Sequence, residues 1–421
     1  MREQLRVDAN QIIDSAIKTV CPDEAVRRAL KDIELSGHVY IVATGKAGWQ
    51  MAKAAVDYLK ETKQSYDKGV VITKYDHVMG ELDGIECFEA GHPIPDENSF
   101  IGTRAALDLT KNLKSEDTVL FLLSGGGSAL FEEPLVSPEE LQSITSQLLA
   151  SGANIVEMNT IRKRLSNVKG GNFALHCNPA KVHSIILSDI IGDPLGMIAS
   201  GPTVADETTS QDAIKILKKY NIKVTLEMET LLRIETPKQV DNANNLVIGS
   251  VRELCKAAAY HCEELGYETV FLTDCLEGEA REVGKMLGAI AKSHAKDGVK
   301  RCYIAGGETI VYLKGNGLGG RNQEIAFAAM REIEGLDNVA VFSVGSDGTD
   351  GPTDAAGGFV DGDSLKKLND VGLKFDDVLD DNDCYHGLKA IDGLVITGPT
   401  GTNVNDFCVA LINNNGRVVD K

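Results

Sequence analysis

The feature that most constrains this chain is a pattern that recurs along it: an apolar run, a turn that contains glycine, and an amphipathic helix. The first copy starts with HVYIVAT at residues 38–44 and passes through Gly45, Lys46 and Gly48 into a helix. Near-continuous apolar, β-branched runs are typical of strands that are covered on both faces. Because strands that alternate with helices form parallel sheets with right-handed crossovers, the pattern predicts an α/β fold.

The first half of the chain carries the larger part of this pattern. Further strands are predicted at residues 68–73, 85–89, 117–123 and 182–188, and helices at 97–113, 137–150 and around 154–175. The series predicts a Rossmann-like domain with a largely parallel sheet over residues 1–240.

A polar stretch, ETPKQVDNAN at residues 235–244, precedes a second series of strands and helices. Its apolar runs are LVIGS, ETVFLT, CYIAGGE, NVAVFSVGSD and LVITG, and its helices are predicted near 251–265, 277–296 and 322–334. We therefore predict a domain boundary near residue 240 and a second, smaller α/β domain over residues 241–421. The amphipathic helix that opens the chain could pack on either domain.

Charge and cysteine content narrow the classes of function. The 62 acidic and 43 basic residues give a formal net charge of -19, which argues against binding to nucleic acid or to an anionic membrane. The nine cysteines include no CxxC pair and favour free thiols in a reducing, cytoplasmic compartment. The sequence contains no signal peptide, no apolar run as long as the roughly 18 residues of a membrane helix, and no histidine cluster typical of a zinc site.

Two turns that contain glycine are candidate anion sites. In the first, Gly45 and Lys46 open a helix, so that N–H groups and a cation would meet an anion there. This segment matches neither the P-loop pattern nor the three-glycine dinucleotide fingerprint, and a solvated lysine in a tight turn is the alternative. The second turn could wrap an oxyanion, either a phosphate or a substrate carboxylate, or could be a plain turn. Its residues are Ser124, Gly125, Gly126, Gly127 and Ser128.

Basic side chains cluster in NTIRKRLSNVKGG at residues 159–171. Four of them, Arg162, Lys163, Arg164 and Lys169, fall within eight residues. In an acidic chain this local reversal of charge indicates an anionic ligand, for which Lys169 is a candidate, or an acidic partner surface. A solvated basic helix face is the alternative.

Carboxylates follow other predicted strands. Asp189 and Asp193 lie beyond the run VHSIIL, and Glu308 lies beyond CYIAGG. Hard cations such as Mg²⁺ take a few oxygen ligands of this kind, whereas turns and helix caps use the same residue types. Arg321 stands between a glycine-rich loop and a predicted helix, and the loop from Asp347 to Asp354 adds carboxylates without the spacing of an EF-hand. This inventory favours phosphoryl transfer, in which a protein mainly positions groups and neutralises charge.

Several motifs, in order and over most of the chain, resemble the glycerate 2-kinases of the class whose C-terminal domain is called MOFRL. The resemblance implies ATP- and Mg²⁺-dependent phosphorylation of D-glycerate at its 2-hydroxyl, in a cleft between the two α/β domains. It also assigns catalysis to Lys46 in GKAG and to Arg321 in GGRNQE. The motifs are VATGKAGWQMAKA, GHPIPD at 91–96, LSGGGSAL, NTIRKRLSNVKGGNFA, LSDIIGDPLGMIASGPT, AGGETIVYLKGNGLGGRNQEIAFAAM and GSDGTDGPTDAAGG.

The candidate residues take the following roles within that activity. Lys46 and Arg321 would neutralise the transferring phosphoryl group and orient glycerate, while the turn from Ser124 to Ser128 would bind the anion. Asp189, Asp193 and Glu308 are candidates for holding Mg²⁺ or for accepting the proton of the attacking hydroxyl, and Asp189 is included among the catalytic residues. The expected partners are a nucleotide and D-glycerate; whether the chain forms a homo-oligomer is left open.

Two alternatives remain at this point. One is an NAD(P)H-dependent hydroxypyruvate reductase, a name also given to relatives in this family, although neither glycine turn has the dinucleotide fingerprint. The other is a non-catalytic protein that binds a sugar phosphate or a carboxylate. The cations and strand-end carboxylates favour chemistry over simple binding.

Overall fold

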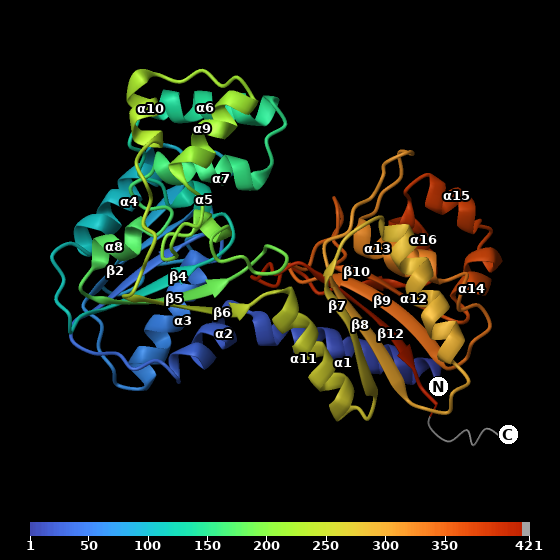
Figure 1. The fold of residues 1–421 in the computed structure, drawn as a ribbon. Helices are drawn as coiled ribbons and strands as arrows, with labels where there is room; N and C mark the ends of the chain where they lie inside the picture. Colours follow the sequence, from blue (N-terminus) through green and yellow to red (C-terminus); the bar gives the residue numbers. More distant parts are fainter. Residues whose placement is uncertain (415–421) are drawn as a thin grey trace. The chain divides into compact units, whose positions relative to one another are not determined.

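The computed structural model describes residues 1–414, which form two compact units. One unit is Pro22–Ile248, and the other joins Met1–Cys21 to the chain from Gly249 onward. Each unit contains its own six-stranded sheet (Figure 1). No helix within residues 1–414 is long and apolar enough to cross a membrane.

The first sheet has the strand order β3-β2-β1-β4-β5-β6. Strand β1 pairs in parallel with β2 and β4, and the pairs β2–β3 and β4–β5 are also parallel. This order is that of the Rossmann fold, and the predicted Rossmann-like architecture is confirmed. The strands are β1 (Val39–Thr44), β2 (Lys68–Lys74), β3 (Ile85–Ala90), β4 (Thr118–Leu123), β5 (Lys181–Leu187) and β6 (Ala243–Gly249).

The run LVIGS, which the sequence places in the second domain, lies in β6 and belongs to the first sheet. The polar stretch before it is therefore a loop that leads to the last strand of the sheet. The chain passes from one unit to the other between Ile248 and Gly249, instead of near residue 240.

Alternate side chains of the first sheet enter two separate cores. Ile41 and Ala43 pack with α2 and α3, whereas Val42 packs on the opposite face with α4, α5 and α8. Strands buried on both faces need apolar residues at every position, which explains the continuous apolar runs in the sequence. The helices are α2 (Pro22–Leu30), α3 (Gly48–Glu61), α4 (Glu97–Leu109), α5 (Gly127–Leu130) and α8 (Asn172–Cys177).

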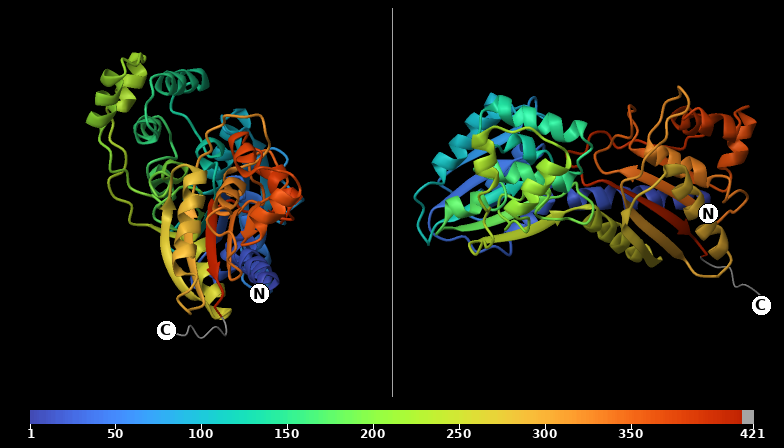
Figure 2. Two further views of the ribbon diagram at one scale, coloured as in Figure 1. Left: turned by 90° about the vertical axis from the view of Figure 1, so that its right-hand side faces the viewer. Right: turned by 45° about the horizontal axis from the view of Figure 1, so that its top comes forward.

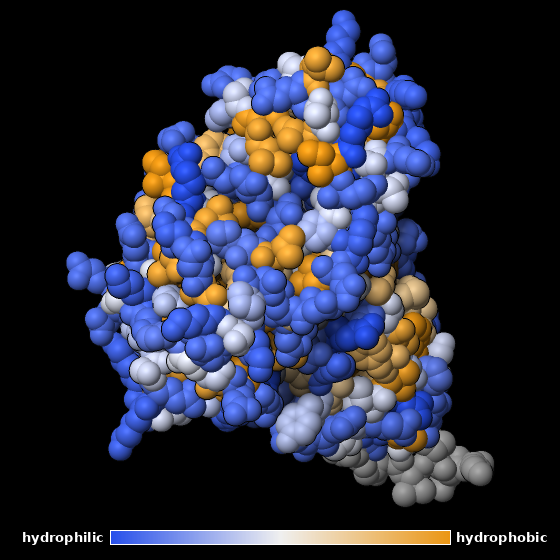
Figure 3. Space-filling model, turned by 60° about the vertical axis from the view of Figure 1, so that its left-hand side comes forward, coloured by the Kyte–Doolittle hydropathy of each residue, from blue (hydrophilic) through white to orange (hydrophobic). Residues whose placement is uncertain are grey.

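Four further helices of this unit have a core of their own, which includes Leu148, Ile161 and Leu217. Figure 1 and the left-hand view of Figure 2 show α6, α9 and α10 as a group of helices apart from the sheet. Their surface mixes hydrophilic and apolar side chains (Figure 3), with Leu149 and Leu226 among the exposed apolar residues. The helices are α6 (Pro138–Ala150), α7 (Ile155–Arg164), α9 (Ser210–Lys219) and α10 (Leu226–Leu232).

The helix predicted around residues 154–175 is two helices, α7 and α8. Between them Gly170 and Gly171 have φ values of 60° and 90°. Such left-handed backbone is accessible to glycine and interrupts a right-handed helix.

The second sheet has the order β11-β10-β9-β12-β8-β7 and is mixed. Only β7 and β8 are paired in parallel among its described pairs; the pairs β8–β12, β12–β9, β9–β10 and β10–β11 are antiparallel. Two of its strands, β10 and β12, were not predicted from the sequence. The strands are β7 (Glu268–Leu276), β8 (Arg301–Gly307), β9 (Val339–Gly345), β10 (Gly357–Asp361), β11 (Leu394–Val395) and β12 (Asp406–Ile412).

Helices cover both faces of the second sheet. The opening helix α1 (Arg2–Val20) packs with α11 (Val251–Glu264) on one face, where the Tyr267 hydroxyl donates a 2.6 Å hydrogen bond to Asp8. The opposite face carries α12 (Ala280–His294) and α13 (Arg321–Ala329), which contact each other. Three short helices join them, α14 (Ser364–Asp370), α15 (Phe375–Asp380) and α16 (Cys384–Ala390).

Candidate active site

The candidate residues of the first unit gather where the carboxyl ends of its parallel strands meet. Strand order reverses between β1 and β4, and ligands of open α/β sheets bind outside the strand ends at such a switch point. Lys46 follows β1, and Gly125 and Gly126 follow β4. The Lys46 N–H donates a 2.8 Å hydrogen bond to the carbonyl of Gly125, so the two turns are joined directly.

The turn after β1 offers its lysine side chain but few backbone donors. The N–H groups of Gly45, Lys46 and Gly48 all donate to backbone carbonyls, and the N–H of Ala47 donates to the Ser124 hydroxyl at 3.0 Å. The backbone role predicted for Gly45 in anion binding is therefore not available, because these donors are already used. Within residues 1–414 the Lys46 ammonium has no ion pair.

The turn after β4, in contrast to the turn after β1, offers backbone N–H donors. None of the hydrogen bonds within residues 1–414 uses the N–H of Gly125 or Gly126 as donor. Gly126 has a φ of 88°, a conformation that L side chains rarely adopt. Successive unused N–H groups in a turn form a concavity that suits an anion, so this turn fits the oxyanion site predicted from its sequence.

The two serines of this turn have structural partners. The Ser124 hydroxyl is buried, accepts from Ala47 and lies 3.3 Å from the carbonyl oxygen of Thr44, so it links the two turns instead of lining an open site. Ser128 lies 3.3 Å from the hydroxyl of Ser200, which donates to Asn159. Gly127 starts α5.

Asp189 lies against the glycine turn. A Cβ atom at Gly125 would lie 2.1 Å from a carboxylate oxygen of Asp189, so the glycine allows the acid to lie this close to the turn. Asp193 follows in a turn where it has a φ of 51°, and its Oδ1 is buried without a hydrogen-bond partner within residues 1–414.

No group of three or more histidine, cysteine, aspartate or glutamate side chains within residues 1–414 is arranged to hold a metal ion. Mg²⁺ in phosphoryl-transfer enzymes is held by one or two carboxylates together with substrate phosphates and water. Asp189, beside a turn with two unused N–H donors, fits that kind of site.

Two histidines that were not among the predicted site residues lie at the same strand ends. His77 follows β2, and its Nδ1 is 2.9 Å from the carbonyl oxygen of Lys46, so Nδ1 carries the proton and fixes the turn. His92 follows β3, in the motif GHPIPD. A Cβ atom at Gly126 would lie 3.1 Å from its Nε2 and 3.3 Å from Cγ of Lys46.

Lys169, predicted to bind substrate or phosphate, is fully buried away from solvent. Its ammonium donates to Glu132 at 2.5 Å and to the carbonyl of Phe131 at 3.1 Å, and the Ser166 hydroxyl donates to the same carboxylate at 2.5 Å. Burial lowers the pKa of Lys169 to about 8, against the opposing effect of Glu132. We therefore leave Lys169 out of the proposed site.

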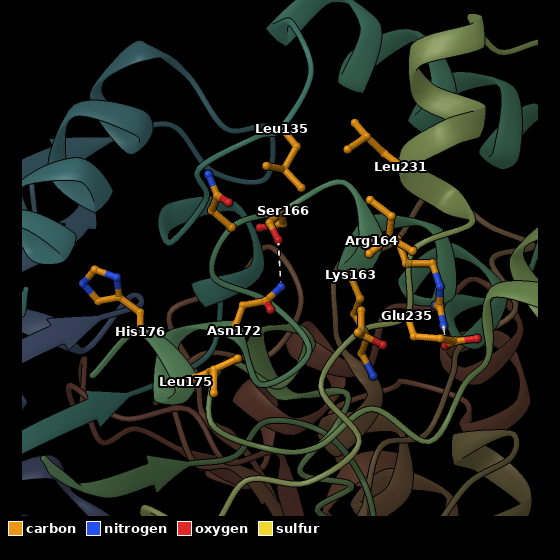
Figure 4. A pocket seen from close by; sticks show the side chains of 12 residues that line it. Leu135, Lys163, Arg164, Ser166, Asn172, Leu175, His176, Leu231 and Glu235 are labelled. Atoms are coloured by element: carbon orange, nitrogen blue, oxygen red, sulfur yellow. Dashed lines mark hydrogen bonds and ion pairs between the residues drawn. The ribbon is translucent and has the colours of Figure 1, made fainter. Parts of the chain in front are cut away.

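The rest of the basic cluster is also tied to the protein. Arg162 donates to the carbonyl of Ser128 at 2.9 Å. Lys163 and Arg164 share the buried Asp206, at 3.1 and 3.4 Å. They line a pocket of about 390 Å³, with Glu235 on the same wall (Figure 4). None of the residues lining this pocket belongs to either glycine turn.

In the second unit Arg321 is the first residue of α13, as predicted. Its Nε and Nη2 donate to the two oxygens of Asp406, at 2.5 and 3.2 Å, and its Nη1 donates to Glu308 at 2.9 Å. Burial lowers the pKa of Arg321, but the hydrogen bond and the charge of Asp406, with the charge of Glu308, outweigh it and raise the pKa. A guanidinium has five N–H donors, so two remain for a ligand.

Asp350, from the predicted aspartate loop, holds the start of α13. Its carboxylate accepts from the backbone N–H groups of Asn322 and Gln323, at 3.1 and 2.8 Å. Burial raises its pKa to about 7, although these N–H donors favour the ionised form. A Cβ at Gly320 would overlap the Asp350 carboxylate, which explains the glycine immediately before Arg321.

Asp406 is the residue of this unit that the sequence did not reveal. It starts β12, between Gly307 at the end of β8 and Gly345 at the end of β9. Because β12 is antiparallel to both neighbours, its first residue lies beside their last ones. The only sequence signal was an aspartate at the head of the apolar run DFCVALI, and β12 itself had not been predicted.

Comparisons with known proteins agree with this architecture. The family model described as a domain of unknown function, DUF4147, matches residues 8–233, and the MOFRL family model matches residues 301–406. The D-glycerate 2-kinase of Thermotoga maritima is 49% identical over 97% of this chain and 99% of its own length. A crystal structure of glycerate kinase from the same organism has a TM-score of 0.93 at 48% identity and covers 98% of this chain and 100% of that one.

Other relatives extend the comparison. The glycerate 2-kinase of Pyrococcus horikoshii is 42% identical over 96% of both chains. A relative from Agrobacterium vitis, 37% identical over 96% of this chain and 93% of its own length, has a name that provisionally assigns it to hydroxypyruvate reductase. The resemblance predicted from the motifs is confirmed: this chain belongs to the family of glycerate 2-kinases with a C-terminal MOFRL domain.

Proposed function

We propose that the protein transfers the γ-phosphoryl group of ATP to the 2-hydroxyl of D-glycerate, giving 2-phosphoglycerate and ADP. The observation that carries this proposal is the turn after β4. Among residues 1–414 it has two unused N–H donors and lies against the stem of Lys46, whose ammonium makes no ion pair there, at the switch point of a Rossmann sheet. A transferring phosphoryl group spreads negative charge over three oxygens, and fixed donors of this kind stabilise it.

In this mechanism the first unit provides the phosphoryl site. The N–H groups of Gly125 and Gly126 donate to phosphate oxygens, and Lys46 neutralises the charge that develops during transfer. Lys46 can do so because its backbone is held from both sides, by the Gly125 carbonyl and by His77. A fixed backbone limits the reorganisation needed when the charge develops.

The second unit provides Arg321. Its two remaining N–H groups can form a bidentate pair with a carboxylate or a phosphate. We propose that it binds an anionic group of the substrate or nucleotide, and that Asp406 keeps the guanidinium in the required orientation. Glu308, whose side chain is 48% exposed, is the partner that a substrate anion can replace.

A bound Mg²⁺ would supply positive charge that offsets the charge of the phosphate groups. We propose Asp189 as its protein ligand. Replacing Asp189 by asparagine is expected to raise the Mg²⁺ concentration needed for half-maximal activity at least tenfold, because a neutral amide is a weaker ligand for a hard cation. Titrating activity with Mg²⁺ at saturating glycerate checks this. If the Mg²⁺ requirement is unchanged and the KM for glycerate rises instead, Asp189 binds the substrate and the metal is held elsewhere.

Hydroxypyruvate reduction is the alternative suggested by a relative's name. A dinucleotide-binding Rossmann domain holds the pyrophosphate on backbone N–H groups of the turn after its first strand. Here the N–H groups of Gly45, Lys46, Ala47 and Gly48 are bonded within the protein, which disfavours that activity.

One experiment tests the kinase against both alternatives. Purified protein with ATP, Mg²⁺ and D-glycerate is expected to form ADP and 2-phosphoglycerate, identified by ³¹P and ¹H NMR, which separates the 2-phosphate from the 3-phosphate. Oxidation of NADH or NADPH by hydroxypyruvate without ADP formation would establish the reductase. Binding of glycerate without turnover in either assay would establish a non-catalytic protein.

A further inference from the structure

A histidine beside the glycine turn has no role in the mechanism above. His92 lies in the loop after β3, and the Cδ2–Nε2 edge of its ring faces Gly126: a Cβ at that glycine would be 3.0 and 3.1 Å from these two atoms. The same Cβ position is 3.3 Å from Cγ of Lys46. The imidazole and the stem of Lys46 therefore border the same point of the turn whose N–H groups are unused.

The His92 ring is available for a ligand. It is only partly buried, and within residues 1–414 neither ring nitrogen makes a hydrogen bond or an ion pair. His77, by contrast, uses its Nδ1 to hold the Lys46 carbonyl. Burial, followed by the charges of Lys46 and Lys74, lowers the pKa of His92, which favours the neutral imidazole, in which one nitrogen has a free lone pair.

The loop that carries His92 is well fixed. Asp96 caps α4 by accepting from the Ser99 N–H at 3.1 Å, and it accepts from the Tyr75 hydroxyl at 2.7 Å. A side chain at Gly91 would contact the Asp96 carboxylate and collide with the carbonyl of Ile94. A histidine held at this position needs little reorganisation to meet a substrate, which is what a proton acceptor in catalysis requires.

We infer that His92 is a further catalytic residue, the base that accepts the proton of the hydroxyl group that attacks the phosphoryl group at the turn of Gly125 and Gly126. The inference rests on the proposed kinase function. In the step, the hydroxyl oxygen forms a bond to the γ-phosphorus, the bond from that phosphorus to the β–γ bridging oxygen breaks, and ADP leaves with the electron pair. The hydroxyl proton moves to the imidazole nitrogen of His92 and from there to solvent.

The test compares wild type with H92A and H92Q, with H38Q as a matched control. His38 lies in the same unit, before β1 and therefore at the opposite end of that strand from Lys46; its side chain is 64% exposed and pairs with Asp67. Glutamine keeps a hydrogen-bonding group but cannot take up a proton. We expect both His92 variants to lose about 100-fold in kcat, typical of a lost general base, with KM for glycerate within threefold, unchanged thermal unfolding and partial recovery of H92A by added imidazole. H38Q should match wild type.

The outcomes separate the two claims. A wild-type enzyme without ADP formation from glycerate refutes the proposed function itself. An active wild type whose H92Q variant keeps kcat within threefold refutes the base, because the hydrogen bond alone then suffices. If thermal unfolding shows that the His92 variants lose activity only in proportion to a loss of folded protein, the role of His92 is structural. That result also refutes the inference.

Discussion

Replacing Lys46 by methionine is expected to lower kcat by at least 100-fold while leaving the free energy of unfolding nearly unchanged. The expected loss corresponds to about 2.7–4 kcal/mol of transition-state stabilisation, the range for removal of one preorganised donor. The free energy of unfolding should stay nearly the same because the Lys46 ammonium has no ion pair within residues 1–414, so its removal leaves no buried charge unpaired. The methionine side chain is also similar in length to the aliphatic part of the lysine side chain. Steady-state kinetics and thermal unfolding of the same preparation provide both quantities.

A second lysine provides the control. Lys53 lies on α3 and its side chain, 44% exposed, pairs with Asp57. K53M should keep wild-type kcat and KM, because exposed ion pairs contribute little. If K46M retains activity within about tenfold of wild type, Lys46 does not neutralise the transferring group.

Arg321 should behave differently from Lys46, and the contrast follows from its partners. R321M leaves the buried Asp406 carboxylate without its bidentate donor, so this variant should lose stability as well as activity. Thermal unfolding and steady-state kinetics of R321M, compared with those of K46M, measure the two effects.

The fold of the first unit could be predicted because its strands and turns are determined by residues that are close together in the sequence. Four strands that are largely buried, β1, β2, β4 and β5, appear as apolar runs, and glycine turns follow β1 and β4. The second sheet was harder. β12 enters between β8 and β9 from the far end of the chain, and no local pattern encodes that insertion. Asp406 could not be identified as the partner of Arg321 without it.

The proximity of several candidate residues was also predictable. Lys46, Gly125, Gly126 and Asp189 follow strands that lie together in the sheet, so their convergence follows from strand order. Which of their polar groups are already used does not follow from sequence. Ser124 and Lys169 are of the right chemical type for an anion site, yet tertiary contacts direct both of them into the protein. Conversely, His92 reaches Gly126 from a loop beyond β3, a proximity that only the folded chain reveals.

Replacing Lys169 by methionine is expected to destabilise the protein by about 3–5 kcal/mol, the cost of leaving a buried carboxylate without its counter-charge. Both side chains of the pair are fully buried, and Ser166 alone would remain as donor to Glu132. The double variant E132Q/K169M removes both charges and keeps an acceptor for the Ser166 hydroxyl, so it should recover most of the loss. Urea unfolding of the two variants measures the difference. At temperatures where K169M is folded, its KM for ATP and for glycerate should equal the wild-type values. A K169M enzyme as stable as wild type but with a raised KM would instead establish Lys169 as a phosphate ligand, because a lysine that binds substrate contributes to affinity and not to the stability of the free protein.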